Sequence, residues 1–209
     1  MDTKLATPSS TSLSQLQILH AAIQSCSLCK LRAGCTQVVP GEGPSRAYLM
    51  FLAEAPGESE DQQGQPLIGK TGHIFRNAAE RAEIDLKKCY VSHCVRCRPP
   101  ENRTPNPDEV EACWPWVLKT LQIIKPRIIV PLGDTALRTL AYKFGFQKFL
   151  RKDKITNLAG KPFYVEDRKF YVFPMVHPSY AARRRDVREA FRAHFVYLKE
   201  AIPGWLIRT

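Results

Sequence analysis

Apolar and polar positions along the chain predict helices and buried strands in turn. From Ser12, which can serve as an N-cap, apolar residues recur with helical spacing as far as Ile23. Short apolar runs bounded by turn residues are typical of buried strands, and four of them lie at 47–53, 89–95, 127–132 and 170–176. Helical patterns separate or follow these runs at 72–82, 108–121, 136–142 and 186–201.

Strands that alternate with helices predict an α/β fold, with a mainly parallel sheet covered on both faces. We expect residues 144–161, whose periodicity is weak, to form an irregular crossover. Ligands of such sheets bind beyond the carboxyl ends of the strands. We therefore expect one crevice to gather the polar groups that follow the four strands, which are Glu54-Ala-Pro-Gly57, Ser92-His93, Gly133-Asp134 and His177-Pro-Ser179.

Composition and charge narrow the choice of partner. The 209 residues, 44% hydrophobic and 24% charged, suit one globular domain, which we place at 12–209 after a loose, flexible Ser/Thr-rich leader at 1–11. The 31 Lys and Arg against 20 Asp and Glu give a net charge of +11. Such a charge indicates a nucleic acid first and an anionic membrane surface second.

The chain shows neither a membrane span nor an export signal. No apolar run approaches the roughly 18 residues that a spanning helix needs. The N-terminus lacks the apolar core and small-residue cleavage site of a secretory signal. We therefore predict a cytoplasmic protein, in which the seven cysteines, an odd number, stay mostly reduced.

Two pairs of cysteines indicate a metal centre. Cys26 and Cys29 form a CxxC at the end of the predicted first helix, and Cys113 follows Cys97 by sixteen positions. Four thiolates in this arrangement can bind zinc or an iron–sulfur cluster. Spacing alone leaves open both the metal and the second pair, because Cys35 is close enough to Cys29 to compete as a ligand.

Carboxylates and a histidine supply candidate catalytic groups. Glu54 at a strand end, with Asp61 and other acidic residues nearby, can activate water or stabilise a developing cation, although the run also reads as a solvated acidic loop. A lone histidine at a strand end, as His177 is, is more often structural. The basic run Arg183–Arg185 beside it would oppose a helix dipole, which favours phosphate contact over a solvated helix start.

Four stretches in collinear order resemble the family 4 uracil-DNA glycosylases. They are 54–69 (EAPGESEDQQGQPLIG), 95–105 (VRCRPPENRTP), 129–133 (IVPLG) and 177–179 (HPS). The resemblance spans Cys26 to about Arg185 and implies a three-layer α/β/α sandwich around a central four-stranded, mainly parallel sheet. It also implies a structural [4Fe–4S] cluster, whose ligands by position are Cys26, Cys29, Cys97 and Cys113. The remaining cysteines, outside the motif, are Cys35, Cys89 and Cys94.

The resemblance further implies a reaction on DNA. A monofunctional, monomeric enzyme would hydrolyse the N-glycosidic bond of a pyrimidine turned out of the stack and leave an abasic site. Glu54 and Asp61 would handle the attacking water and the oxocarbenium-like sugar, and His177 would donate to the pyrimidine O2 as negative charge grows there. The base pocket would comprise Ala55, Gly57, Leu67 and His93. DNA contacts would come from Lys70, Arg98, Arg103, Ser179, Arg183, Arg184 and Arg185.

Three departures from the family pattern concern the base. Leu67 stands where the family usually has a phenylalanine that stacks on the base, and His93 where it usually has an asparagine that reads the uracil edge. A neutral imidazole offers one donor and one acceptor on opposite sides of its ring, so it does not read uracil as an amide does. Ala181-Ala182 lies where a bulky wedge is common, so Arg183 would take its place.

These departures predict an altered base preference. The candidates are uracil and an enlarged or 5-substituted pyrimidine, such as a hypermodified cytosine of phage DNA, so that the role would be DNA repair or phage defence. Two other functions stay open. One is a non-catalytic or covalently trapping DNA-binding member of the superfamily, and the other is a cluster-dependent redox sensor that uses the spare thiols.

Overall fold

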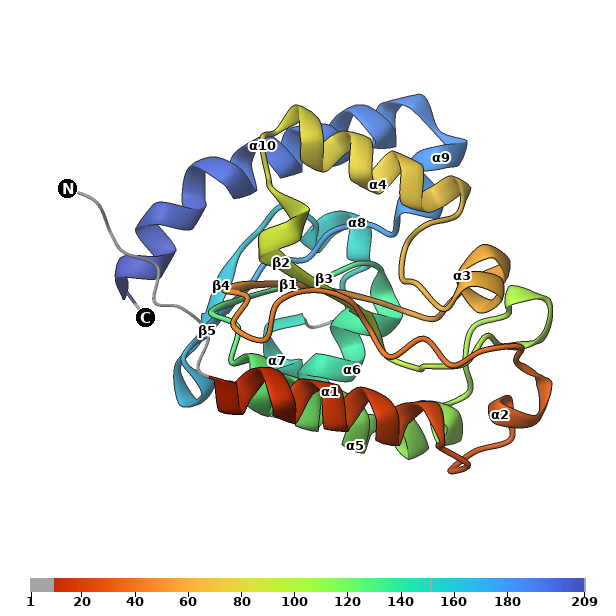
Figure 1. Cartoon of the computed structure of the whole chain (residues 1–209). Helices are drawn as coiled ribbons and strands as arrows, with labels where there is room; N and C mark the ends of the chain where they lie inside the picture. Colours follow the sequence, from red (N-terminus) through yellow and green to blue (C-terminus); the bar gives the residue numbers. More distant parts are fainter. Residues whose placement is uncertain (1–9, 151, 209) are drawn as a thin grey trace.

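The computed structural model describes residues 10–150 and 152–208, and a five-stranded sheet lies at its centre (Figure 1). The strands, in the spatial order β2-β1-β3-β5-β4, are β1 (Leu49–Ala53), β2 (Cys89–His93), β3 (Ile128–Pro131), β4 (Phe163–Val165) and β5 (Phe170–Val172). β1 pairs in parallel with β2 and β3, and β3 pairs in parallel with β5. The predicted α/β fold with a mainly parallel sheet is confirmed.

The fifth strand corrects the predicted four-stranded sheet. β4 pairs antiparallel with β5 at the sheet edge, where Tyr164 lies opposite Tyr171. β4 directly follows the segment predicted as an irregular crossover, which instead carries α7 (Gln147–Leu150) and α8 (Ile155–Leu158). Two of the three β4 residues are only partly buried. The apolar run of β4, Phe-Tyr-Val, is only three residues long, so the pattern of apolar positions did not reveal a strand there.

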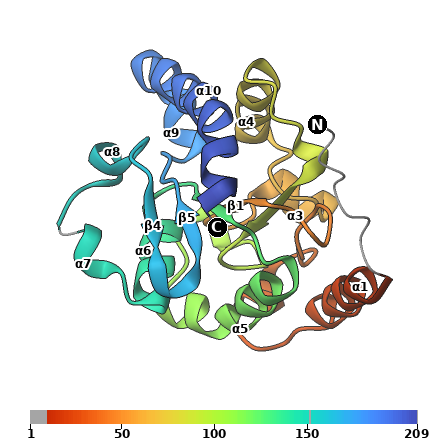
Figure 2. The ribbon, with the colours of Figure 1, turned by 90° about the vertical axis from the view of Figure 1, so that its left-hand side faces the viewer.

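Helices cover both faces of the sheet and complete the three-layer α/β/α sandwich. One face carries α4 (Lys70–Arg81), α9 (Pro178–Arg183) and α10 (Arg185–Arg208). The other carries α1 (Ser10–Gln24), α5 (Pro107–Ile124) and α6 (Asp134–Phe144), and Figure 2 shows the sheet between the two layers. Alternate residues of β1 point to opposite faces, so Leu49 and Phe51 pack in one hydrophobic cluster and Met50 and Leu52 in the other.

Shorter elements connect these layers. They are α2 (Leu31–Gly34), α3 (Glu58–Gln63) and single turns of 3₁₀ helix at Leu86–Lys88, Pro100–Asn102 and Glu166–Arg168. α1 begins at Ser10, two residues before the predicted start of the domain, and residues 1–9 of the predicted leader lie outside the described residues. Among the helices of the described ranges, none is both long and apolar enough to cross a membrane.

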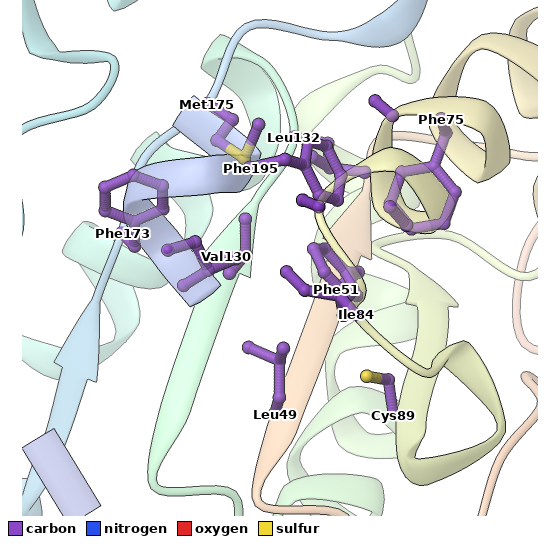
Figure 3. Packing of buried hydrophobic residues seen from close by; sticks show 14 of the residues in the cluster. Leu49, Phe51, Phe75, Ile84, Cys89, Val130, Leu132, Phe173, Met175 and Phe195 are labelled. Carbon is purple, nitrogen blue, oxygen red and sulfur yellow. The ribbon is translucent and has the colours of Figure 1, made fainter. Parts of the chain in front are cut away.

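Phe51 ties β1, an interior strand of the sheet, to the helices of one face (Figure 3). Its ring lies 4.9 Å from the ring of Phe75 on α4 and 5.8 Å from that of Phe195 on α10, between centroids. All three side chains are at most 1% exposed. Because Glu54 follows β1 directly, this aromatic contact also holds the strand that carries a candidate catalytic group.

We expect Phe51→Ala to lower the free energy of unfolding by about 3–5 kcal/mol, because it leaves a cavity among rings that cannot fully collapse into it. Urea unfolding followed by circular dichroism measures this loss. Ile207→Ala is the matched control, since Ile207 is 87% exposed and its truncation should change stability by no more than about 0.5 kcal/mol. Equal effects of the two substitutions would contradict the packing described here.

Candidate active site

A pocket of about 560 Å³ opens at the carboxyl ends of the parallel strands. Its walls include Glu54 after β1, His93 at the end of β2, Gly133 after β3 and His177 after β5. The sequence predicts that these strand ends lie close together, and in the structure they surround this one pocket. The other predicted base-pocket residues, Ala55, Gly57 and Leu67, also line this pocket.

Glu54 accepts a hydrogen bond from Thr135, which is not among the candidate site residues predicted from the sequence. The Thr135 hydroxyl, in the first turn of α6, donates to Glu54 Oε2 at 2.5 Å. Thr135 follows Gly133-Asp134 directly, so its place just after a strand end was the available signal. The bond holds one carboxylate oxygen and orients the group along the pocket wall, as positioned acid–base catalysis requires.

His177 is held in one tautomer by the helix that it begins. The backbone N–H of Ser179 donates to His177 Nδ1 at 3.2 Å, and the Ser179 hydroxyl lies 2.8 Å from the same nitrogen. Burial lowers the pKa of His177 to about 4, which outweighs the opposing effect of Glu60, so the ring is neutral near pH 7. Because Nδ1 accepts a hydrogen bond, the proton of the neutral ring lies on Nε2, which is then a donor.

His93 forms a buried, neutral part of the pocket. It pairs in register with Ala53, is 1% exposed, and its Nδ1 has no hydrogen-bond partner among the described residues. Burial, with smaller contributions from the charges of Arg96 and His177, lowers the pKa of His93 to about 3. The ring therefore offers one donor and one acceptor at neutral pH, as the sequence analysis assumed.

A buried carboxylate shapes the loop that carries Leu67. Glu60 Oε1 accepts from the backbone N–H groups of Ile68 and Gly69 at 2.8 and 2.9 Å, and its Oε2 accepts from Gly57 at 3.1 Å. The turn between them holds Leu67 at a positive φ of 50° with its side chain 3% exposed. Glu60 thus joins the two loop segments that form one side of the pocket.

Asp61 differs from its predicted position. Its side chain is buried and accepts hydrogen bonds from the backbone N–H groups of Thr36 at 3.0 Å and Gln37 at 3.4 Å. It is not among the residues that line the pocket. Its carboxylate anchors the segment after α2 to α3, and of the predicted pair of carboxylates it is Glu54 that lines the pocket.

The predicted DNA-binding residues fall into two groups. Lys70, Arg103, Ser179 and Arg183 line the pocket, and the others lie outside its walls. Several of the arginines already have acidic partners. These pairs are Arg98 with Glu58 at 3.7 Å, Arg103 with Glu109 at 2.7 Å, Arg184 with Asp186 at 2.7 Å and Arg185 with Glu189 at 3.0 Å.

Helix α9, which precedes Arg184 and Arg185, contains Ala181 and Ala182 and is held from α10. Arg188 Nε donates to the carbonyl of Ala181 at 3.1 Å, and its Nη2 donates to that of Ala182 at 2.6 Å. Ala181 is fully buried, so it packs in the core and leaves the exposed Arg183 at the rim of the pocket.

Four of the seven cysteines line one cavity, separate from the base pocket. They are Cys26, Cys29, Cys97 and Cys113. All seven cysteines are free of disulfides. Trp116 Nε1 donates to Cys26 Sγ at 3.1 Å, and the backbone N–H of Arg96 donates to Cys113 Sγ at 3.3 Å. Cysteine sulfurs are the usual ligands of iron–sulfur clusters, so the four cysteines of this cavity fit such a cluster.

One pocket at the end of the parallel sheet thus holds a carboxylate and a neutral imidazole, with basic side chains at its rim, and such groups suit an enzyme that acts on a nucleic acid. Residues 40–199 match the uracil DNA glycosylase superfamily, and the chain belongs to that superfamily. The resemblance drawn from the motifs is thereby confirmed, and the chain is a DNA glycosylase of the type-4 group.

Three relatives illustrate the similarity. The type-4 uracil-DNA glycosylase of Sulfurisphaera tokodaii is 34% identical over 191 residues, which cover 90% of this chain and 85% of the relative. That of Thermotoga maritima is 36% identical over 171 residues, or 81% of this chain and 84% of the relative. That of Pyrobaculum aerophilum is 38% identical over 146 residues, or 70% of this chain and 72% of the relative.

The lowered pKa of His93 predicts a pH dependence of stability. The unfolded ring binds a proton near pH 6.5, whereas the folded ring does so only near pH 3, so stability is lost as the pH falls through this range. At pH 5 the loss amounts to about 2 kcal/mol relative to pH 7.5. His93→Asn should remove this part of the difference in urea unfolding between the two pH values, and His73→Asn, at an exposed site, should leave it unchanged. An unaltered difference in His93→Asn would contradict the buried, neutral imidazole.

Proposed function

We propose that this glycosylase hydrolyses the N-glycosidic bond of a flipped-out pyrimidine in DNA and leaves an abasic site, acting as a monomer in the cytoplasm. The observation that carries the proposal is the placement of Glu54 and His177, 123 positions apart in the sequence, on the walls of one pocket. Three relatives carry the name uracil-DNA glycosylase, which makes uracil the first candidate base. The place of the enzyme in base excision repair follows from this chemistry.

Glu54 supplies the negative charge on the sugar side. As the bond from C1′ to the base breaks, its electron pair leaves with the base and positive charge develops on the sugar ring. A carboxylate beside the ring stabilises that charge and can take a proton from the water that attacks C1′. The Thr135 hydroxyl holds one oxygen of Glu54, and this leaves the carboxylate oriented before the substrate arrives.

His177 supplies the donor on the base side. Negative charge grows on the pyrimidine O2 as the bond breaks, and Nε2–H of the neutral ring can donate to it. Ser179 keeps the other nitrogen occupied as an acceptor, so the ring does not need to change tautomer during the reaction. A preorganised donor of this kind is worth about 3–4 kcal/mol of the barrier in other acyl- and group-transfer enzymes.

Leu67 and His93 support a base preference broader than uracil. Leu67 and His93 both line the pocket. Leu67 offers a base no aromatic face to stack on, and His93 presents a single donor and a single acceptor on opposite ring edges. Uracil needs a donor for O4 and an acceptor for N3–H on the same edge. We therefore propose that 5-substituted or otherwise enlarged pyrimidines, including a hypermodified phage cytosine, are substrates as well, which would extend the role from repair to phage defence.

The four cysteines of the second cavity are proposed to hold a [4Fe–4S] cluster. When bound, the cluster would supply a covalent link between the end of α1, the loop after β2 and helix α5, and so stiffen the loop that carries Arg98 and Arg103. The base chemistry above uses only side chains of the first pocket.

Glu54→Gln should lower single-turnover base release about 10²- to 10⁴-fold, because the amide keeps the shape but removes the charge and the base. The assay follows alkali-labile sites in a duplex with one uracil. Glu58→Gln is the matched control, since Glu58 lines the same pocket but its side chain is 65% exposed. DNA binding without release of any base by the unmodified chain, and without change on replacing Glu54, would favour the non-catalytic alternative, whereas unchanged release of uracil by Glu54→Gln would contradict the role of Glu54.

Restoring the usual family residues should shift the base preference. In the variant Leu67→Phe/His93→Asn we expect the ratio of kcat/KM for uracil to that for 5-hydroxymethylcytosine to rise about tenfold, the effect of one hydrogen bond worth about 1.4 kcal/mol. Otherwise identical duplexes with the two bases measure it, and Ile207→Ala should leave the ratio unchanged. Efficient release of uracil alone by the unmodified chain would refute the broadened preference.

A further inference from the structure

Arg96 is a cation buried without a carboxylate. Its side chain is 1% exposed and lies in the interior beside helix α5. Nη2 donates to the Thr120 hydroxyl at 3.1 Å, whereas Nε and Nη1 have no hydrogen-bond partner among the described residues. No described Asp or Glu forms an ion pair with it. A buried guanidinium without a compensating negative charge is strongly unfavourable, so its presence calls for an anion nearby.

The titratable groups near Arg96 on α1 and β2, which are His20, Tyr90 and His93, do not supply that anion. Burial, followed by the charge of Arg96, lowers the pKa of both His20 and His93. Burial raises the pKa of Tyr90 to about 12, and its hydroxyl is paired with His20 at 2.8 Å. All three groups are therefore neutral near pH 7.

Arg96 also lines the cavity that is lined by the four cysteines. Its backbone N–H donates to Cys113 Sγ. A chain of hydrogen bonds continues from its guanidinium. The Thr120 hydroxyl donates to the carbonyl of Trp116 at 2.7 Å, and the indole of Trp116 donates to Cys26 Sγ. The backbone of Arg96 thus contacts one of the four sulfurs directly, and its guanidinium is linked through Thr120 to Trp116, whose indole donates to a second sulfur.

We propose that Arg96 is the counter-charge of the four-cysteine centre, and that its guanidinium balances the net negative charge of the cluster and raises its reduction potential. This inference rests on the proposed [4Fe–4S] cluster. Net charge and hydrogen bonds to the sulfurs are among the quantities that set the potential of such a cluster. Adding an electron to an anionic centre becomes less favourable when a nearby buried cation is removed, because the low-dielectric interior screens the charge weakly.

The test compares Arg96→Gln, which removes the charge, with Arg96→Lys, which keeps it. Iron and sulfide content and visible absorption measure the cluster, and a redox titration of each purified full-length holoprotein measures its midpoint potential. For Arg96→Gln we expect the reduction equilibrium constant to fall at least tenfold, or 59 mV for a one-electron couple. Arg96→Lys should stay close to the unmodified protein.

Loss of the cluster in Arg96→Gln together with its retention in Arg96→Lys also supports the counter-charge. If both variants keep the unmodified potential, or both lose the cluster alike, the charge of Arg96 has no such role and the inference fails. Absence of iron and sulfide from the unmodified protein would overturn the cluster and the inference together. In either case base release tests the glycosylase function separately, through Glu54 and His177.

Discussion

The parallel register of β1 with its neighbours is the constraint on which the site depends. The ladder of backbone hydrogen bonds continues past the strand ends, from Cys94 N–H to the Ala53 carbonyl and from Leu132 N–H to the Leu52 carbonyl, both at 2.8 Å. This ladder therefore also fixes the positions of the residues that follow the strands. Because side chains alternate across a sheet, a slip of one residue in β2 would replace His93 by Cys94 in the pocket.

Burial then decides the proton states that the pocket offers. Both imidazoles on its walls are neutral near pH 7, chiefly because the charged form would lose its hydration. A neutral His177 still donates through Nε2, and it does so without adding a positive charge that would compete with the sugar for Glu54. The two strand ends thus provide a negative group and a neutral donor, which matches a reaction whose charge separates between sugar and base.

The sequence predicted most of this arrangement, because strand ends of a parallel sheet meet at one edge and the polar residues after each run are visible in the chain. The sequence could not show which of Glu54 and Asp61 lines the pocket, because the position of each carboxylate depends on hydrogen-bond donors far away in the chain. Asp61 meets the amides of Thr36 and Gln37, 25 and 24 positions away in the chain. The hydrogen bond from Thr135 to Glu54 spans 81 positions and has no local signature either.

The same limit applies to the basic residues. The net charge of +11 indicated DNA, but it did not show which cations are available to phosphates. Arg184 and Arg185 form exposed ion pairs, which contribute little to stability, so a phosphate can replace such partners at little cost.

Arg103 is different, because the carboxylate of Glu109 that it binds through two hydrogen bonds is fully buried. Releasing Arg103 to DNA would take two hydrogen bonds from that buried charge and leave it only the backbone N–H of Asn106 and the ammonium of Lys30 at 3.7 Å, which is unfavourable. The Arg103 guanidinium therefore holds the loop after Cys97 against the start of α5. Lys70 and Arg183 line the pocket and form no ion pair with any described residue, so we propose them for direct contact with phosphates.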